Sequence, residues 1–373
     1  MLGSCIGTLG VLVLAALPAI AQTSKTDSRD ILLDPFETQP QFLSAERYTE
    51  GWDQYFYFDD GSLLSTHFLV TNLGIGDHRG LVVGTLVRTD GTTLTIKNGR
   101  ARRDWSHATD QLDMRIASHE LAQRPGHYRL YLNNASGEIE VNFRAISEPW
   151  RIGRTWEDAS RGHYQSVSVY APMANAEGRF RLGPRSGGDP VNEPWSTLGA
   201  GRGFGLRYAN SVALASIATD WLRVFPLGSE QTLAPALNAI SKTDGGRGAQ
   251  FAIVNPKDGR LRQADTVVVE YESIEIARHR GRIHEVPAKL SVRGRGSGFS
   301  VSGTIVPVRF LHKFDLVKEL KPIERFIVQF MTTPVHFRYL ADYDIDFTSD
   351  GSTSRLTGKA LVEFLSLKSR TAE

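Results

Sequence analysis

Apolar and polar residues alternate along many short segments of the chain, and glycine-containing turns separate these segments. Alternation with a period of two is typical of strands that bury one face. Four Asp-Gly dipeptides supply the positive φ angles that tight hairpin turns require, at residues 60–61, 90–91, 258–259 and 350–351. We therefore predict antiparallel hairpins that pair residues 53–58 with 63–71, 80–88 with 92–97, 128–132 with 138–145, and 341–348 with 354–365.

Helical periodicity is scarce along the rest of the chain. Only residues 232–241 and 314–325 carry apolar side chains at helical spacing, and Pro322 interrupts the second stretch. Glu177-Gly178 is interpreted as a further turn, and residues 199–205 as a glycine-rich surface loop. Many short strands without long helices predict an all-β protein, either a barrel or a sandwich.

The length of 373 residues suits two domains or one large β unit. Hairpin spacing lapses at residues 149–161, and we take this break as the boundary between two β units. The predicted domains are residues 30–155 and residues 160–370. Neither half shows a repeat of 20 to 50 residues, which argues against solenoids and propellers.

The first residues predict a secretory signal peptide that is cut after Ala21. Residues 1–24 carry no charged side chain, and an apolar run precedes Pro18 and a small-x-small triplet at residues 19–21. A retained membrane anchor is the alternative, although the run is shorter than the ~20 residues that span a bilayer. We expect export to the periplasm. Removal of residues 1–21 would also remove Cys5, the only cysteine, and with it disulfides, thiol catalysis and thiolate metal sites.

The charge balance argues against a nucleic-acid partner. The chain has 43 Lys and Arg against 41 Asp and Glu, for a net charge of +2, so no global field attracts a polyanion. One local cluster, Arg278, Arg280 and Arg282, alternates along a predicted strand. It predicts either a transient contact with an anionic membrane surface or a solvated edge strand that its charges protect from aggregation.

Three segments in order resemble a double-barrel, lipocalin-like superfamily. They are residues 51–78, residues 163–210, and residues 332–347 followed by 358–364. The superfamily contains the AttH-like proteins, the survival-factor proteins, hydroxyneurosporene synthase (a carotenoid hydratase) and, more distantly, tocopherol cyclase. The resemblance implies two calycin-type antiparallel β-barrels packed together, with an apolar ligand in a barrel interior or at the seam between them.

The same resemblance bears on chemistry. The hydratase and survival-factor relatives carry a Gly-x-Gly-aromatic-x-Asp-His run, in which the acidic residue is a proton donor to an isoprenoid double bond. Here residues 201–207 keep the glycines and Phe204, but Leu206 and Arg207 occupy the Asp-His positions. Leucine cannot donate a proton and arginine stays charged. We therefore predict a non-catalytic carrier of a hydrophobic small molecule, a lipid or isoprenoid, with no cofactor.

The predicted ligand-binding residues combine aromatic rings with one cation. Arg207 is the predicted contact for a polar headgroup, and the predicted lining is Tyr55, Phe204, Tyr208 and Trp221. No catalytic residue is assigned. No metal site is predicted, because His279 and His284 are five residues apart on a predicted strand and would lie on opposite faces.

Two alternatives remain open at this point. The first is an isoprenoid hydratase or cyclase on the same scaffold that uses a substitute acid, either Asp220 or one of Asp342, Asp344 and Asp346. It requires a carboxylate within reach of a cavity. The second is a β-sandwich that binds glycans, which requires exposed rings at Trp150 and Trp156.

Overall fold

The computed structural model describes residues 40–72, 77–183, 193–227, 233–243, 245–315, 334–367 and 370–371. By its internal contacts the chain divides into two compact units, Met1–Asp30 and Ile31–Glu373. Every feature below belongs to the second unit. The predicted signal peptide, with Cys5, lies outside the described residues, as does most of the predicted helix at 314–325.

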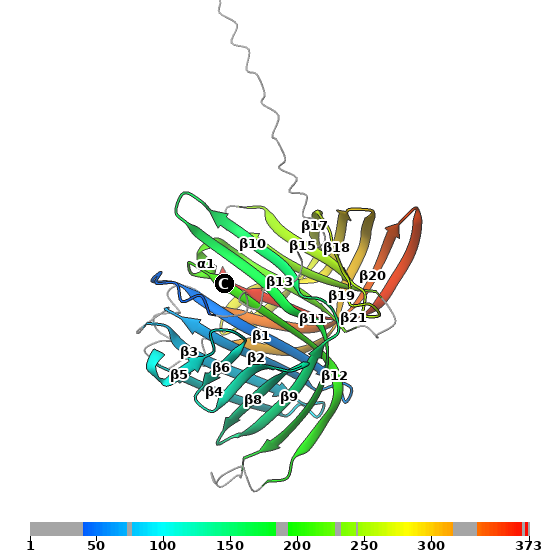
Figure 1. The fold of residues 1–373 in the computed structure, drawn as a ribbon. Helices are drawn as coiled ribbons and strands as arrows, with labels where there is room; N and C mark the ends of the chain where they lie inside the picture. Colours follow the sequence, from blue (N-terminus) through cyan, green and yellow to red (C-terminus); the bar gives the residue numbers. More distant parts are fainter. Residues whose placement is uncertain are drawn as a thin grey trace, which may run out of the picture. The chain divides into compact units, whose positions relative to one another are not determined.

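Sheet A is antiparallel and contains the first twelve strands (Figure 1). Its order is β4-β3-β2-β1-β12-β11-β9-β8-β7-β6-β5, and β10 pairs separately with β11. The strands are β1 (Thr49–Phe58), β2 (Leu63–Thr71), β3 (Arg79–Val87), β4 (Thr93–Arg100), β5 (Trp105–His107), β6 (Asp113–Ile116), β7 (His119–Arg124), β8 (His127–Asn134), β9 (Gly137–Ala145), β10 (Trp150–Asp158), β11 (His163–Leu182) and β12 (Ser196–Asn210).

Sheet B contains the remaining strands in the order β16-β15-β14-β13-β21-β20-β19-β18-β17, and β22 pairs with β18. A four-residue helix, α1 (Leu214–Ile217), precedes it and is the one α-helix among the described residues. The strands are β13 (Ala218–Pro226), β14 (Ala234–Lys242), β15 (Arg247–Val254), β16 (Leu261–Gln263), β17 (Thr266–His279), β18 (Arg282–Gly296), β19 (Phe299–Asp315), β20 (Val335–Ser349), β21 (Ser352–Ser366) and β22 (Arg370–Thr371).

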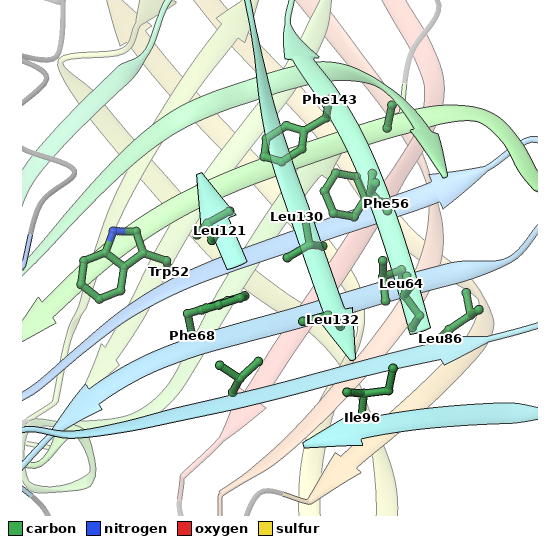
Figure 2. Packing of buried hydrophobic residues seen from close by; sticks show 14 of the residues in the cluster. Trp52, Phe56, Leu64, Phe68, Leu86, Ile96, Leu121, Leu130, Leu132 and Phe143 are labelled. Carbon is green, nitrogen blue, oxygen red and sulfur yellow. The ribbon is translucent and has the colours of Figure 1, made fainter. Parts of the chain in front are cut away.

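Each sheet curls into a barrel that its own side chains fill. In sheet A, a Cβ atom on Gly84 of β3 would lie 2.1 Å from Leu132 of β8, although five strands separate these two in the sheet. Figure 2 shows aromatic and aliphatic side chains of this barrel pointing into one shared core. In sheet B, Arg247 of β15 donates a hydrogen bond of 2.7 Å to the carbonyl of Val269 on β17, which brings the two ends of the sheet together. We call these structures barrel A and barrel B.

The outer faces of the two barrels pack against each other, and we call this contact the seam. Strands β1 and β12 of barrel A and strands β13, β14 and β21 of barrel B contribute its centre. Its larger buried apolar side chains are Tyr55, Leu63, Trp150, Phe204, Leu206, Trp221, Phe225, Ile240, Leu361 and Leu365. The all-β, double-barrel prediction is therefore confirmed, and the sandwich alternative is not.

The predicted hairpins are confirmed. The Asp-Gly turns join β1 to β2, β3 to β4, β15 to β16, and β20 to β21, and each turn glycine has a positive φ angle. On β20, Tyr343, Ile345 and Phe347 are buried in barrel B. The alternating Asp342 and Asp344 instead face outward, where they pair with Lys359 and Arg355. These two aspartates, named as possible substitute acids, therefore lie on the outer face of the strand and not in the barrel interior.

The helix predicted at residues 232–241 is wrong, because its described part forms strand β14. This strand is buried on both faces, with Ala236 and Ile240 in the seam and Leu237 and Ala239 inside barrel B. When both faces are apolar, a period of two leaves no trace in the sequence. The incidental spacing of the larger apolar residues then imitates a helix.

Two glycine-rich stretches predicted as a turn and a loop are instead parts of long strands. Gly178 lies within β11, and residues 199–205 lie within β12. Their glycines make room for aromatic rings: Cβ atoms on Gly178, Gly203 and Gly205 would come within 2.5 to 2.7 Å of Phe58, Phe56 and Tyr170, respectively. The predicted turn and loop are therefore wrong. Glycine is needed at these positions for close packing, and not for reversal of the chain.

This packing gives a direct prediction for Gly205. Its replacement by alanine should lower the free energy of unfolding by about 1–3 kcal/mol, because the new methyl group overlaps the buried Tyr170 ring. Urea denaturation measures the effect. Gly248→Ala in β15 is the matched control, since its Cβ would meet no atom closer than 3.4 Å. Equal stabilities of the two variants would contradict this account.

The chain passes from sheet A to sheet B at residues 211–217, and not at residues 149–161 where hairpin spacing lapses. The lapse has a local cause: β10 pairs with β11 through two register shifts, beside Gly153 and Trp156. Strands β11 and β12 then complete barrel A, so residues 163–210 belong to the first sheet. That the halves form separate domains stays a prediction.

Candidate functional site

A network of charged and hydrogen-bonding side chains is buried at the centre of the seam. Asp53 and His67 come from neighbouring strands of barrel A, and their side chains are joined by 2.8 Å. Arg223 from barrel B donates to Asp53 at 2.7 Å and also binds Glu363. The full set is Asp53, Tyr55, His67, Arg223, His336, Arg338 and Glu363.

Glu363 is the centre of this network. Tyr55 donates a hydrogen bond of 2.6 Å to its carboxylate, His336 lies 2.9 Å from it, and Arg338 donates at 3.1 Å. Burial opposes ionisation of Glu363, but Arg223 and Arg338 outweigh burial and hold its pKa well below the usual range. Glu363 is therefore a stable anion that ties barrel A to barrel B.

Asp53 is also ionised, and its position matters for chemistry. Burial would raise its pKa, but His67 and Arg223 lower the pKa below the usual value. Asp53 is the cross-strand partner of Leu206, so a carboxylate sits beside the position where the resembled family has its acid. Because Asp53 and Glu363 hold no proton, this network contains no carboxylic acid that could protonate a double bond.

The structure brings four of the five predicted ligand-binding residues to the seam. Tyr55 stacks on Phe225 with ring centroids 4.9 Å apart, and the Phe204 ring lies 3.8 Å from that of Phe225. Tyr208 meets the Trp221 ring edge to face at 5.3 Å. All are packed against protein, and their role in ligand binding stays a prediction.

Arg207 faces the other way, into barrel A. Its Nε donates a hydrogen bond of 2.6 Å to Glu50, and it lies over the Trp52 ring at 5.9 Å. Tyr48 also donates to Glu50. The guanidinium is buried and paired, so it does not lie with the other four predicted residues. A period of two separates them: Phe204, Leu206 and Tyr208 face the seam, while Arg207 faces the interior.

The rings proposed for a glycan site do not form an exposed platform. Trp150 is 1% exposed, lies in the seam, and donates to Gln263 at 3.0 Å. Trp156 is half-buried. The glycan-binding alternative requires exposed rings at these two positions, and the structure does not provide them.

A cavity of about 800 Å³ opens at one end of barrel B, and we call it the barrel B cavity. Its lining contains the apolar side chains of Ile274, Ile283 and Phe364 and the charged side chains of Lys242, Arg247 and Glu285. Ile274 is 49% exposed, so part of the apolar lining is open to solvent. We call the polar lining side chains on the adjacent strands β14, β13 and β21 the floor of the cavity; they include Asp220, which was named from the sequence as a substitute acid.

Asp220 accepts hydrogen bonds from three hydroxyl groups. Tyr271 donates at 2.7 Å, Ser241 at 2.8 Å and Thr219 at 3.0 Å. Tyr271 is held in its protonated form, because burial and the nearby Asp220 raise its pKa. Arg247 lies 3.6 Å from the centre of the Tyr271 ring and donates to Ser241 at 3.0 Å. The cavity thus holds a carboxylate that is hydrogen-bonded to a phenol, and a cation that lies over the ring of that phenol.

A second polar pair lies beside Asp220. Ser366 is its cross-strand partner on β21, so both side chains point to the same face of sheet B. The hydroxyl of Ser366 lies 2.9 Å from Nδ1 of His284, which is 1% exposed. Burial is the main cause that lowers the pKa of His284 to about 4, so the ring is neutral near pH 7. Its Nε2 has no hydrogen-bond partner among the described residues.

Other candidate features are weaker. A second cavity of about 730 Å³ lies beside residues 200–202 of β12, and Asp59, Arg144 and Arg202 are among its lining residues. The described residues contain no group of three His, Cys, Asp or Glu side chains arranged as metal ligands would be. Within the same residues, no helix has the length and apolar character to cross a membrane.

The arginine cluster does not lie along one strand. Arg278 ends β17, Arg282 begins β18, and the turn between them contains Arg280 with a φ angle of 50°. The prediction of alternation along one strand is wrong, because the sequence resembles an uninterrupted strand where the chain reverses. All three side chains are exposed at the hairpin tip. Contact with a membrane surface stays a prediction.

The fold is that of known double-barrel proteins. CghA in complex with Sch210972 matches with a TM-score of 0.60 and 12% identity, over 86% of this chain and 89% of that one. A protein assigned as AttH from Nitrosomonas europaea matches with 0.57 and 13%, over 90% and 97%. Kievitone hydratase from Nectria haematococca matches with 0.52 and 11%, over 90% and 93%. No family model and no curated protein sequence matches the chain.

These matches confirm that the chain has the AttH-like, double-barrel lipocalin fold. At such low identity they establish the fold alone. The chemistry of this chain has to come from its own side chains, and above all from those that line its cavities.

Proposed function

We propose that the chain is an enzyme of the hydratase or cyclase class that acts on a small apolar molecule in the barrel B cavity. The observation that carries the proposal is Asp220, a carboxylate hydrogen-bonded to Tyr271 on the floor of a cavity of about 800 Å³. A cavity of this size suits a ligand of small-molecule dimensions. The apolar lining side chains Ile274, Ile283 and Phe364 favour a ligand with an apolar body, and the polar side chains of the floor favour a polar group on it.

The residues divide into a base and an acid. Asp220 is the base that accepts a proton, and Tyr271 is the acid that donates one, since its raised pKa keeps it protonated. Arg247 supports the exchange, because its positive charge stabilises the phenolate that Tyr271 becomes. Both hydration and ring closure at a double bond need one proton removed and one proton added.

The enzyme reading is better supported than the carrier predicted from the sequence. The carrier prediction rests on Leu206 and Arg207, which replace the acidic pair of the resembled family, whereas Asp220 supplies a carboxylate at a different place. The structural neighbour from Nectria haematococca is a hydratase by name, which fits this reading. Export to the periplasm stays part of the proposal, carried by residues 1–21 alone.

Replacement of Asp220 by asparagine tests the proposal. Turnover of apolar substrates, screened with a panel that contains both carbonyl-conjugated and isolated double bonds, should fall by about 100-fold or more, because the base is lost while the shape is kept. Displacement of an apolar fluorescent probe should be unchanged, since the cavity remains. Products are measured by mass spectrometry as a gain of water or as an isomer.

The control is Asp342→Asn, which removes an exposed carboxylate on β20. Bound apolar ligand with no turnover in the unmodified protein would restore the carrier hypothesis. Failure of the protein to bind any apolar probe would exclude both readings.

A further inference from the structure

The row of polar side chains on the cavity floor runs across three adjacent strands. Ser241 on β14, Asp220 on β13 and Ser366 on β21 are consecutive cross-strand partners. Cross-strand partners share one face, with Cβ atoms about 4.5–5.5 Å apart. A small group such as water that touches Ser366 therefore also lies within reach of Asp220.

His284 can orient the Ser366 hydroxyl group. In the tautomer that carries its proton on Nε2, Nδ1 of His284 accepts the Ser366 hydrogen, and one lone pair of the Ser366 oxygen suffices to accept a hydrogen bond from a molecule in the cavity. His284 can serve as that acceptor because it is neutral near pH 7. One proton of a water held by Ser366 would then point to Ser366, and the other is available to the carboxylate of Asp220.

The acid in this cavity is weak. Tyr271 is a phenol whose pKa is raised by burial, so it cannot protonate an isolated double bond to give a carbocation. A phenol can protonate the carbanion-like carbon of an enolate, which is far more basic. A base beside a weak acid therefore selects a substrate whose double bond is already polarised.

Resting on the proposed function, we propose that the reaction is reversible addition of water to a double bond conjugated to a carbonyl group, with Ser366 and His284 positioning the water. The water oxygen bonds to the β carbon as Asp220 takes one of its protons, and the π electrons form an enolate. Tyr271 gives its proton to the α carbon and becomes a phenolate. Asp220 returns the proton to Tyr271 along their hydrogen bond of 2.7 Å.

This cycle is balanced without any further reactant. The substrate gains one hydroxyl and one hydrogen, which are the elements of one water. Asp220 and Tyr271 end in the states in which they began. Arg247 stabilises the transient phenolate from 3.6 Å. The substrate class is therefore an apolar enone, in place of an unactivated isoprenoid.

The test compares two probes on the full chain in deuterated water. Chalcone is an apolar enone whose near-ultraviolet absorbance disappears on hydration. A prenylated phenol carries an unactivated double bond. We expect hydration of chalcone, with one deuterium on the α carbon, and no hydration of the prenyl group. Suppose instead that the protein hydrates the prenyl group but not chalcone, and that Asp220→Asn abolishes this activity. That result would overturn this inference and leave the proposed function intact.

The positioning pair is tested on the same probe. Ser366→Ala and His284→Gln should each lower kcat for chalcone by about 10-fold or more with little change in KM, because water and not chalcone loses its contact. Ser366→Thr, which restores a hydroxyl, should recover most of the rate. Ser302→Ala on the exposed face of β19 is the matched control.

Urea denaturation of each variant separates loss of folding from loss of positioning. An unchanged kcat in stable Ser366→Ala, or equal losses in the alanine and threonine variants, would overturn the role of the pair. If chalcone and the prenylated phenol both remain unchanged and no apolar probe binds, the proposed function fails as well.

Discussion

Replacement of Glu363 by glutamine is expected to lower the free energy of unfolding by about 3–5 kcal/mol, because it removes one partner of a buried ion network. Glu363 is fully buried and neutralises Arg223 and Arg338. Glutamine keeps the size of the side chain, so the loss reports charge rather than a cavity. Arg223 would then keep Asp53 as its anionic partner, and Arg338 would lose the carboxylate with which it pairs.

Urea denaturation at pH 7 measures this loss, with exposed Glu275→Gln as the control. A double variant, Glu363→Gln with Arg338→Met, should recover part of the stability, since the uncompensated cation is then removed. A loss below about 1 kcal/mol for Glu363→Gln alone would show that the network does not hold the barrels together.

Acidification should produce the other large effect. Burial is the main cause that lowers the pKa values of His119, His284, His312 and His336 to about 4, against 6.5 in an open chain. Between pH 6.5 and 4 the unfolded chain takes up protons that the folded chain does not. Stability is therefore full above pH 6.5 and is lost as the pH falls through this window.

Four such protons correspond to a slope of at most about 5 kcal/mol per pH unit. The depressed pKa values of Asp53 and Glu363 add a loss of the same sign at still lower pH. Urea denaturation at pH 7.5, 6 and 5 measures the slope. His119→Gln should reduce the slope by the contribution of about one proton, because this histidine lies in barrel A, apart from the other three. A free energy of unfolding that does not change between pH 7 and 5 would contradict the conclusion that these buried histidines are neutral.

The outer hairpins could be predicted well from the sequence because their strands have one solvent-exposed face. Asp342, Tyr343 and Asp344 alternate visibly, and Asp350-Gly351 marks the turn. Strands buried on both faces lose that alternation, so β14 imitated a helix. Glycines that accommodate rings from another strand, such as Gly205 against Tyr170, cannot be told from turn glycines without knowing the neighbour.

The candidate sites were predictable only in part. Asp220 was visible as a carboxylate beside a tryptophan, but Tyr271 and Ser366 lie 51 and 146 residues further along the chain, and only barrel closure brings them together. The seam network was missed for the same reason. Its members carry no common spacing, and the pairing of Asp53 with Arg223 depends on how two barrels meet.

The double burial of the seam strands also limits how this protein could be divided. Strand β12 presents Phe204 and Leu206 to the seam and its glycines to the rings inside barrel A, and β13 likewise has no wet face at its centre. Cleavage at residues 211–217 would leave each half with a sheet face of exposed aromatic rings and unpaired charges. Such a gene could acquire a new loop or a new cavity lining, but it could not donate one barrel alone to another protein.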